Sequence, residues 1–468
     1  MKKDLSYFDL TNIVVGAIVG SDIYIASALT AGLVGPFSII VWIIAGILAT
    51  ILAMIFAYSS YYVPRVGGSF AFVSTAFNDF YGFLAGWSMW IAEVLSLPVF
   101  AITFTNYLRY FVPLNLAEQI LIRGAFLFGL TAVNIFGVKA AGRLNDALTI
   151  AKLSPLLLLV IVGLGSAFYN PSFFSNYSPF APFGIGNFGT SLILIFWAYA
   201  GFELGTLPAA EVRDPKKTIP RAIITGMAIV IFFYLTTNFV IFGTVSSPQL
   251  AQTVVPLILV GSALLAAVGA TIVSLGALVS VSGSDESAIL GTARLAYAMS
   301  IDGLFPKTFA RIHPRFNTPY SALIVQGVIA FALSTFSGLT NLISFAVFNL
   351  SFSFLLVSIS FFKLQKRGEK GLHGQRVLPW LGAGICLYLL YSTTLQDKIA
   401  GGILVLVGIP FYIYFSPKTD LEDLKSLFTS EDAIRSRNLA KKHRFLANLV
   451  RLLAGVYRKL RGTPTPKN

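Results

Sequence analysis

The sequence has little charge, one cysteine and three histidines, and each shortage excludes a class of protein or site. Charged residues make up 12% of the 468 positions, against about 25% in soluble globular proteins, which excludes an ordinary soluble domain. The single cysteine, Cys386, cannot form an internal disulfide and lies in an apolar run, where a small buried side chain is expected. The histidines, His313, His373 and His443, lie in polar stretches, which excludes a histidine proton relay inside a membrane.

The sequence also lacks the patterns that hold cofactors. No cluster of His, Cys, Asp and Glu has the spacing of a metal site, and no glycine-rich loop is typical of ATP binding. A membrane-embedded enzyme would need a nucleophile with a base, or a metal cluster, at membrane depth. We therefore expect no cofactor, no metal and no enzymatic activity.

Long apolar runs are what the sequence has instead. Hydrophobic residues make up 56% of the chain, and a run of about 18 or more is typical of a membrane span. The sequence predicts an all-α polytopic membrane protein with twelve transmembrane helices. The run at 258–299 is too long for one span, and we interpret it as an external helix followed by a span. The twelve runs lie at residues 10–34, 38–63, 81–111, 119–138, 146–168, 188–207, 220–243, 258–299, 319–336, 339–362, 377–395 and 399–416.

The positions of Lys and Arg indicate how the spans are oriented. With the N-terminus inside, eighteen of the 34 basic residues fall in inside segments and three, Arg109, Arg123 and Lys398, in outside segments. Twelve others lie after residue 416, and Lys152 lies within a span. This asymmetry follows the positive-inside rule and predicts an integral protein of the plasma membrane with both termini cytoplasmic. The net charge of +14 thus describes orientation, and no nucleic-acid partner is expected.

Residues 417–468 form a separate basic segment. Ser430 is a suitable N-cap, and apolar residues recur at helical spacing among the basic residues. The pattern predicts a cytoplasmic amphipathic helix on the anionic inner leaflet, with a solvated basic tail as the alternative. The apolar positions are Phe445, Leu449, Leu452, Leu453 and Val456.

Two predicted spans contain residues that interrupt helices. The first has Gly20 and Ser21 beside Asp22, and the sixth has Gly201 and Gly205 in its middle. In hydrocarbon a broken helix is tolerated only where it lines a cavity, so the breaks mark a candidate site. Because the spans are five apart, they predict a five-plus-five inverted repeat, and close helix packing by glycine is the alternative. The transporter core would comprise residues 1–416, with repeat one at about 10–168, repeat two at about 188–362 and the last two spans at about 377–416.

Four segments of the sequence have a recognisable pattern. They are VGAIVGSDIYI in the first span, VPRVGGSFAFVSTAF at 63–77, FWAYAGFELGTLPAAEVRDPKKTIPRAI at 196–223 and ARLAYAMSIDGLFPKTFARIHPRFNTPYSAL at 293–323. Together they resemble the amino acid–polyamine–organocation (APC) permease superfamily, in its amino acid transporter branch. The segment at 196–223 is close to that superfamily's G-F-E…A-E…N-P-x-x-x-I-P-R-A-I pattern, with Asp214 where Asn is usual. The resemblance runs in order from residue 5 to about 415.

The resemblance implies where the cargo binds. In relatives, backbone N–H groups of the unwound first span bind the substrate carboxylate, and carbonyl groups of the unwound sixth span accept hydrogen bonds from its ammonium group. Trp197 matches an aromatic residue that lies over the substrate as a gate, with packing in the core as the alternative. The matching N–H positions are Ser21, Asp22 and Ile23, and the matching carbonyl positions are Trp197, Ala198 and Ala200.

Asp22 departs from the superfamily, whose members usually have Gly at this position. Its carboxylate can cap the free N–H groups at the start of the second half-helix. Alternatively, it can bind a cargo amine, in which case it would select positively charged cargo.

The apolar spans contain four further acids and one base. An acid at the bilayer centre costs about 3 kcal/mol by insertion scales, so each is expected to face a cavity or a partner. Glu93 aligns with a polar residue that contacts substrate in arginine–agmatine antiporters, and Glu203 belongs to the shared G-F-E pattern. Asp285 and Glu286 are about 100° apart around a helix, and Asp285 is favoured to face the cavity. Lys152 matches a lysine that serves proton coupling in relatives, with a fixed ion pair as the alternative.

These features predict a secondary active transporter that moves amino acids with protons. The excess of four intramembrane acids over bases favours cationic amino acids. A polyamine or amine transporter and an amino acid exchanger remain open, and a non-transporting nutrient sensor is a remote alternative. The expected partners are a small-molecule substrate, protons and membrane lipids, and the sequence does not decide the oligomeric state.

Overall fold

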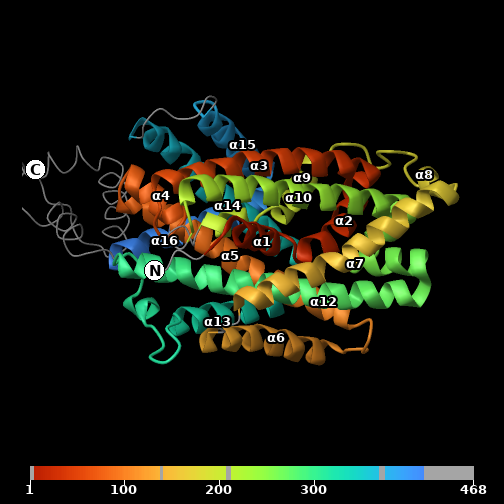
Figure 1. Ribbon diagram of the computed structural model, residues 1–468, viewed down its shortest axis with the longest axis horizontal. Helices are drawn as coiled ribbons and strands as arrows, with labels where there is room; N and C mark the ends of the chain where they lie inside the picture. The colour runs from red at the N-terminus through yellow and green to blue at the C-terminus, as the bar shows by residue number, and fades with distance from the viewer. Residues whose placement is uncertain (1–4, 138–140, 207–211, 368–374, 416–468) are drawn as a thin grey trace, which may run out of the picture. The chain divides into compact units, whose positions relative to one another are not determined.

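The computed structural model describes residues 5–137, 141–206, 212–367 and 375–415, and the predicted tail helix lies outside them. The chain divides into two compact units, Met1–Ile409 and Pro410–Asn468. Within the described residues every regular element is a helix (Figure 1). The all-α fold class predicted from the apolar runs is therefore confirmed.

The long helices follow the apolar runs of the sequence. They are α1 (Tyr7–Ile18), α2 (Ser21–Val34), α3 (Ser38–Tyr62), α5 (Asp79–Leu108), α6 (Leu116–Phe136), α7 (Ala141–Tyr169), α9 (Phe188–Ala198), α10 (Pro215–Thr244), α12 (Pro256–Ile301), α13 (Tyr320–Phe336), α14 (Leu339–Arg367), α15 (Leu378–Ser392) and α16 (Leu395–Phe415). Shorter helices join or flank them: α4 (Ser69–Ala76), α8 (Ser172–Ser175), α11 (Ser247–Ala251), η1 (Gly35–Phe37), η2 (Phe202–Thr206) and η4 (Lys307–Ala310).

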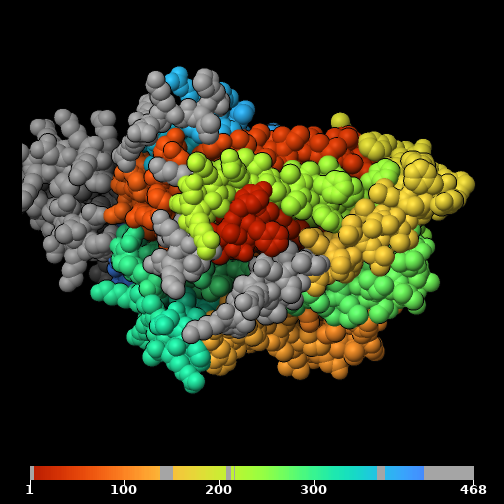
Figure 2. All heavy atoms as spheres, in the orientation of Figure 1, coloured from red at the N-terminus to blue at the C-terminus, as the bar shows by residue number. Residues whose placement is uncertain are grey.

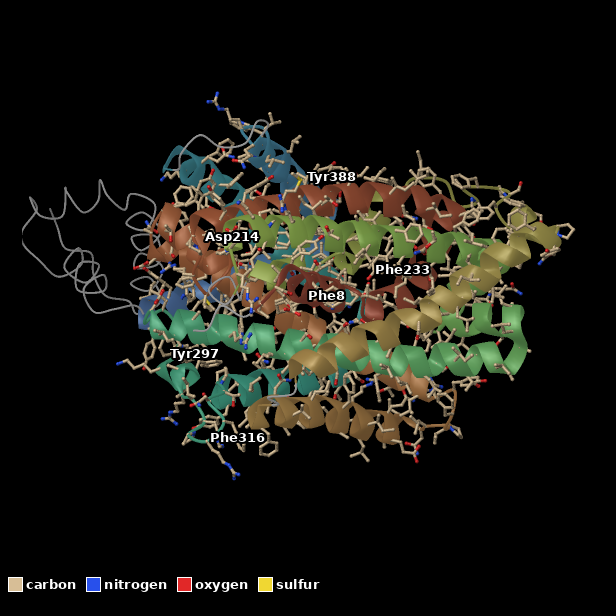
Figure 3. The ribbon with its side chains drawn as sticks, in the orientation of Figure 1. Phe8, Asp214, Phe233, Tyr297, Phe316 and Tyr388 are labelled. Atoms are coloured by element: carbon tan, nitrogen blue, oxygen red, sulfur yellow. The ribbon has the colours of Figure 1, made fainter. Side chains whose placement is uncertain are left out.

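The helices have the length and the surface of membrane spans. In the described part of the chain, nine helical stretches are long and apolar enough to cross a membrane, and α13 and α15 are shorter apolar helices. Large apolar side chains are exposed along them, such as Ile47 of α3 and Phe232 of α10. Figure 3 shows two more, Phe8 on α1 and Tyr388 on α15. Soluble monomers rarely expose so much apolar surface, whereas lipid requires it, so this is an integral membrane protein.

Helix α5 is the most deeply buried of the long helices. It packs against α12, α14 and α4, and the Trp87 indole N–H donates to the Leu404 carbonyl oxygen at 2.8 Å. Helices α6 and α13 lie side by side along one edge of the first unit, and α15 lies against α3 and α14 along another (Figure 1). This packing places α2 and α12 directly against α5.

Helix α1 begins at a capping box and starts at the surface. The Ser6 hydroxyl accepts from the Asp9 N–H at 3.3 Å, and the Asp9 carboxylate accepts from the Ser6 N–H at 2.8 Å. Figure 2 shows the start of the chain at the surface beside α10, where the Tyr7 hydroxyl donates to Thr225 Oγ1 at 2.7 Å. The N-terminal end of α1 is thus attached to α10.

The predicted break in the first span is present between α1 and α2. Helix α1 ends at Ile18, the next two residues leave helical backbone angles, and α2 begins at Ser21. A Cβ atom at Gly20 would lie 2.9 Å from the side chains of both Phe100 and Ser284, so close packing requires glycine there. The break leaves carbonyl groups of α1 and N–H groups of α2 without partners inside a helix.

The predicted break in the sixth span lies between α9 and η2. Helix α9 ends at Ala198, and Gly201 has a φ of +116°, a backbone conformation that favours glycine. A Cβ atom at Gly201 would lie 3.0 Å from the carbonyl oxygen of Ala17 in α1. No side chain separates the two breaks at this point, so they pack backbone against backbone.

The long apolar run at 258–299 is also divided. Within α12, Leu265 and Ala266 have non-helical backbone angles, with a φ of +51° at Ala266. The two arms approach closely because glycines face each other: a Cβ atom at Gly269 would lie 2.1 Å from the carbonyl oxygen of Gly261. The prediction that this run forms two helices is confirmed, and the division lies at residues 265–266.

Candidate functional site

The two breaks enclose a cavity, named here the central cavity. Its lining includes Ile18 and Asp22 from the first break and Trp197, Ala200 and Glu203 from the second. The cavity is narrow and accommodates about two water molecules. Binding of a larger cargo therefore requires the lining helices to move apart.

A second cavity, named here the side cavity, adjoins the central one. It is lined by Gly67 and Ser69, in the segment between α3 and α5, and by Thr292 of α12. Glu93 and Glu203 line both cavities. These two acids therefore mark the junction of the cavities.

The Asp22 carboxylate is held by two donors. Oδ1 accepts from the Gly20 N–H at 2.7 Å, and Oδ2 accepts from the Tyr234 hydroxyl. The hydroxyl oxygen of Tyr234 also lies 3.2 Å from the Ile18 carbonyl oxygen. Asp22 thus folds back over the first break while lining the central cavity. Gly20 is the N-cap residue of α2, so this hydrogen bond lies just before the start of the second half-helix.

Tyr234 is the functional candidate that sequence reasoning missed. Its ring lies in a buried cluster with Trp42 and Tyr199, at centroid distances of 5.2 and 5.3 Å. Tyr199 directly follows α9, so the cluster reaches both breaks. A lone tyrosine in an apolar span gives no periodic signal, and only its donation to Asp22 reveals it.

Lys152 binds to the first break and lines neither cavity. Its ammonium group is buried and donates to the Gly16 carbonyl oxygen at 2.5 Å and to Ser284 Oγ at 3.2 Å. Ser284 in turn donates to the Val19 carbonyl oxygen at 2.7 Å. These contacts satisfy carbonyl groups that the break releases from α1. Among the described residues, no ion pair within 4.0 Å joins Lys152 to Asp22.

Glu203 repeats at the second break what Asp22 does at the first. Its Oε2 accepts from the Gly201 N–H at 3.0 Å, and Oε1 is buried without a hydrogen-bond partner. In both breaks the acid lies two residues after the glycine whose N–H it accepts. Two different spans therefore use the same Gly-x-acid device.

The structure brings together five of the sequence-predicted residues and separates the others from them. Asp22, Glu93, Trp197, Ala200 and Glu203 line the central cavity. The remaining candidates are buried outside the lining of either cavity: Ser21, Ile23, Lys152, Ala198 and Asp285.

Two of these side chains have distinct surroundings. The Trp197 indole N–H donates to Ser96 Oγ at 3.1 Å, and its ring lies 6.1 Å from that of Phe100. Trp197 therefore forms part of the cavity wall in this conformation. Asp285 of α12 is fully buried, and neither carboxylate oxygen has a hydrogen-bond partner. Within the described part of the chain, no group of three or more His, Cys, Asp or Glu side chains is placed to hold a metal ion.

Comparison with known proteins identifies the family. The profile described as "Amino acid permease" matches residues 5–412. The chain belongs to the amino acid permease family. The predicted resemblance to APC permeases is confirmed over nearly the whole chain, and the permease is by family a transporter and not an enzyme.

Individual relatives of the permease differ in their cargo. A methylthioribose transporter of Bacillus subtilis is 28% identical over 90% of this chain and 95% of its own length. A branched-chain amino acid permease of the same organism is 26% identical, over 89% of this chain and 94% of its own. The mouse large neutral amino acids transporter small subunit 2 is 28% identical, over 91% and 84%. Because these cargoes are chemically diverse, the specificity of the permease has to be argued from its own site.

Proposed function

We propose that the permease is a proton-coupled secondary active transporter that prefers cationic amino acids. One observation carries the preference: Asp22, Glu93 and Glu203 line the two cavities, and no Lys, Arg or His does so among the described residues. Acids in an enclosed site of low dielectric favour a positively charged cargo. A polyamine or other amine is the second candidate, because Asp22 places a carboxylate at the start of α2, where a cargo carboxylate would otherwise bind.

The proposed transport cycle uses twelve spans arranged as a five-plus-five inverted repeat. The nine long stretches, with Tyr7–Tyr62 counted as two spans, and the two shorter apolar helices support this number. The shared Gly-x-acid device in the first and sixth spans supports the repeat. The proposed repeats are about 10–168 and 188–362, in a core that ends near residue 416. Both termini would be cytoplasmic, in the plasma membrane, which places the side cavity on the cytoplasmic side.

The proposed cargo contacts follow from the breaks. N–H groups at Ser21, Asp22 and Ile23 begin α2, where orphan donors and the positive end of the helix dipole attract a carboxylate. Carbonyl groups at Trp197, Ala198 and Ala200, where α9 ends, would accept from the cargo's α-ammonium group. The Trp197 ring would move to admit and cover the cargo. The proposed contacts leave out Asp285, which lines neither cavity.

The proposed coupling residue is Lys152. Its ammonium group joins the first break to Ser284 of α12. Removing its proton would weaken the hydrogen bond to the Gly16 carbonyl oxygen, because a neutral amine is a poorer donor than an ammonium group. The protonation state of Lys152 would therefore change how firmly α1 is held.

The test is transport by the purified permease in vesicles with an imposed pH gradient. Labelled arginine should accumulate inside, and unlabelled lysine or ornithine should compete better than leucine or putrescine. Accumulation only when the vesicles are preloaded with an amino acid would identify an exchanger. Binding without uptake would identify a sensor and contradict the proposal.

A further inference from the structure

The three acids around the cavities differ in how their oxygens are occupied. Both oxygens of Asp22 accept hydrogen bonds, from the Gly20 N–H and the Tyr234 hydroxyl. Glu203 uses one oxygen, and its buried Oε1 has no partner. Glu93 is the most accessible of the three, with 8% of its surface exposed against 3% for Asp22 and 2% for Glu203. Free capacity to accept hydrogen bonds therefore lies at Glu93 and Glu203.

Glu93 and Glu203 come from different elements, α5 and η2, and both lie at the junction of the two cavities. Both acids therefore border the same enclosed space. Two carboxylates confined in low dielectric repel each other, and a positive group between them removes the repulsion. A group with several N–H donors, such as an ammonium or a guanidinium, can bond to both acids at once.

We infer that the positive group of the cargo binds between Glu93 and Glu203, at the junction of the central and side cavities, and that Asp22 does not contact it. The inference rests on the proposed function, and it assigns the proposed preference for cationic cargo to the subsite between Glu93 and Glu203. The unpartnered Oε1 of Glu203 accepts one N–H of the cargo, and Glu93 accepts another. The rest of the cargo lies in the central cavity between the two breaks.

Asp22 is instead a positioning residue. Its carboxylate connects the Gly20 N–H, at the break, to the hydroxyl of Tyr234 in α10. The Tyr234 ring packs against Tyr199, which adjoins the second break, and against Trp42. Replacing Asp22 or Tyr234 therefore disturbs the geometry of both breaks, whatever the charge of the cargo.

The test compares arginine with citrulline, which has a neutral group of similar shape in place of the guanidinium. Dissociation constants and initial uptake rates are measured for the reconstituted full-length permease and for Glu93→Gln, Asp22→Asn and Tyr234→Phe. Removing one partner of an enclosed charge pair costs about thirtyfold in affinity. Glu93→Gln should therefore reduce the preference for arginine over citrulline by about thirtyfold. Asp22→Asn and Tyr234→Phe should lower transport of both compounds by the same factor and keep the preference.

The matched control is Glu118→Gln. Glu118 is exposed in the capping box of α6, and glutamine also serves at this position of a capping box. The change removes one carboxylate without touching the cavities, so the preference and the rates should stay as in the parent. Thermal unfolding of each detergent-solubilised variant reports whether it is folded.

Three results would overturn the inference. The first is a preference lost in Asp22→Asn and kept in Glu93→Gln. The second is an unchanged preference in Glu93→Gln with loss of the dependence on pH or Na⁺, because the acid pair would then hold a proton or a metal cation. The third is a parent permease that does not prefer arginine, which overturns the proposed function as well and is seen without any variant.

Discussion

At the scale of the residue, the two breaks depend on glycines that the sequence indicates and on one tyrosine that it does not. Gly20 and Gly201, each two residues before an acid, stand out because helix-interrupting residues in two spans five apart are easy to recognise. The role of Tyr234 depends on its position beside Asp22, from which it is 212 residues away in the chain. Such long-range contacts are set by how helices pack, and local pattern carries no information about them.

We expect Gly201→Ala to disrupt the second break. The new Cβ atom would lie 3.0 Å from the Ala17 carbonyl oxygen, and the φ of +116° is strained for alanine. A cost of about 1–3 kcal/mol in the free energy of unfolding follows, together with loss of uptake. Thermal unfolding and arginine uptake measure the two effects. Gly184→Ala is the control, since Gly184 also has a positive φ, of +70°, but has open space around it; equal losses in both variants would contradict the role given to close approach.

We expect Lys152→Ala to abolish accumulation driven by a pH gradient while cargo binding persists. The variant loses the hydrogen bonds to the Gly16 carbonyl oxygen and Ser284, and these are the contacts that the proposed proton would change. Uptake with and without the gradient, beside equilibrium binding, makes the measurement. Lys217→Ala removes an exposed lysine that pairs with Asp214 and should behave as the parent. Gradient-driven uptake that survives in Lys152→Ala would remove Lys152 from the coupling mechanism.

At the scale of the element, apolar runs of the sequence predict where helices form and less well where they bend. The run at 258–299 is visibly too long for one span, yet nothing in its composition indicates Leu265–Ala266 as the place of division. Alanine is a strong helix former, and here it has a φ of +51° because the two arms of α12 pack on each other through Gly261 and Gly269. Tertiary packing overrides local propensity at this position.

We expect Gly269→Ala to destabilise α12. Its Cβ atom would lie 2.1 Å from the Gly261 carbonyl oxygen, so the arms would have to separate. Forcing extra volume into a packed contact typically costs about 1–3 kcal/mol, which lowers the midpoint of thermal unfolding. Gly129→Ala on α6 has nothing within 4 Å of the new atom and should not lower the midpoint, because alanine favours a helix more than glycine does. A midpoint for Gly269→Ala equal to that of Gly129→Ala would show that the arms do not need this contact.

At the scale of the whole molecule, the uneven distribution of Lys and Arg between segments predicts which side of the membrane each segment faces. The packing of the helices alone does not give this orientation. Eighteen basic residues against three favour both termini inside. The helical runs and the two helix breaks could be predicted from sequence, because they follow from the length of apolar runs and from local helix-interrupting residues. The hydrogen-bond partners of individual carboxylate oxygens could not be predicted from sequence, because they depend on distances between helices.

The orientation can be measured with introduced cysteines, because the one native thiol, Cys386, is buried. A membrane-impermeant maleimide applied to intact cells should label Lys398→Cys, in a predicted outside segment. It should label Arg311→Cys, in a predicted inside segment, only after the cells are permeabilised. Parent protein with Cys386 alone is the control for background. The reverse pattern would invert the proposed topology and place the side cavity on the outer face.

The direct contact of Gly201 with Ala17 has a mechanical consequence. Two broken helices that pack through their main chains have no side chains between them that could adjust to a displacement. A tilt of one helix therefore displaces the other as well, so the two broken helices have few independent motions. In the proposed transporter this linkage disfavours conformations open to both faces at once, so a change that inserts a flexible spacer at this contact should cause an uncoupled leak of ions.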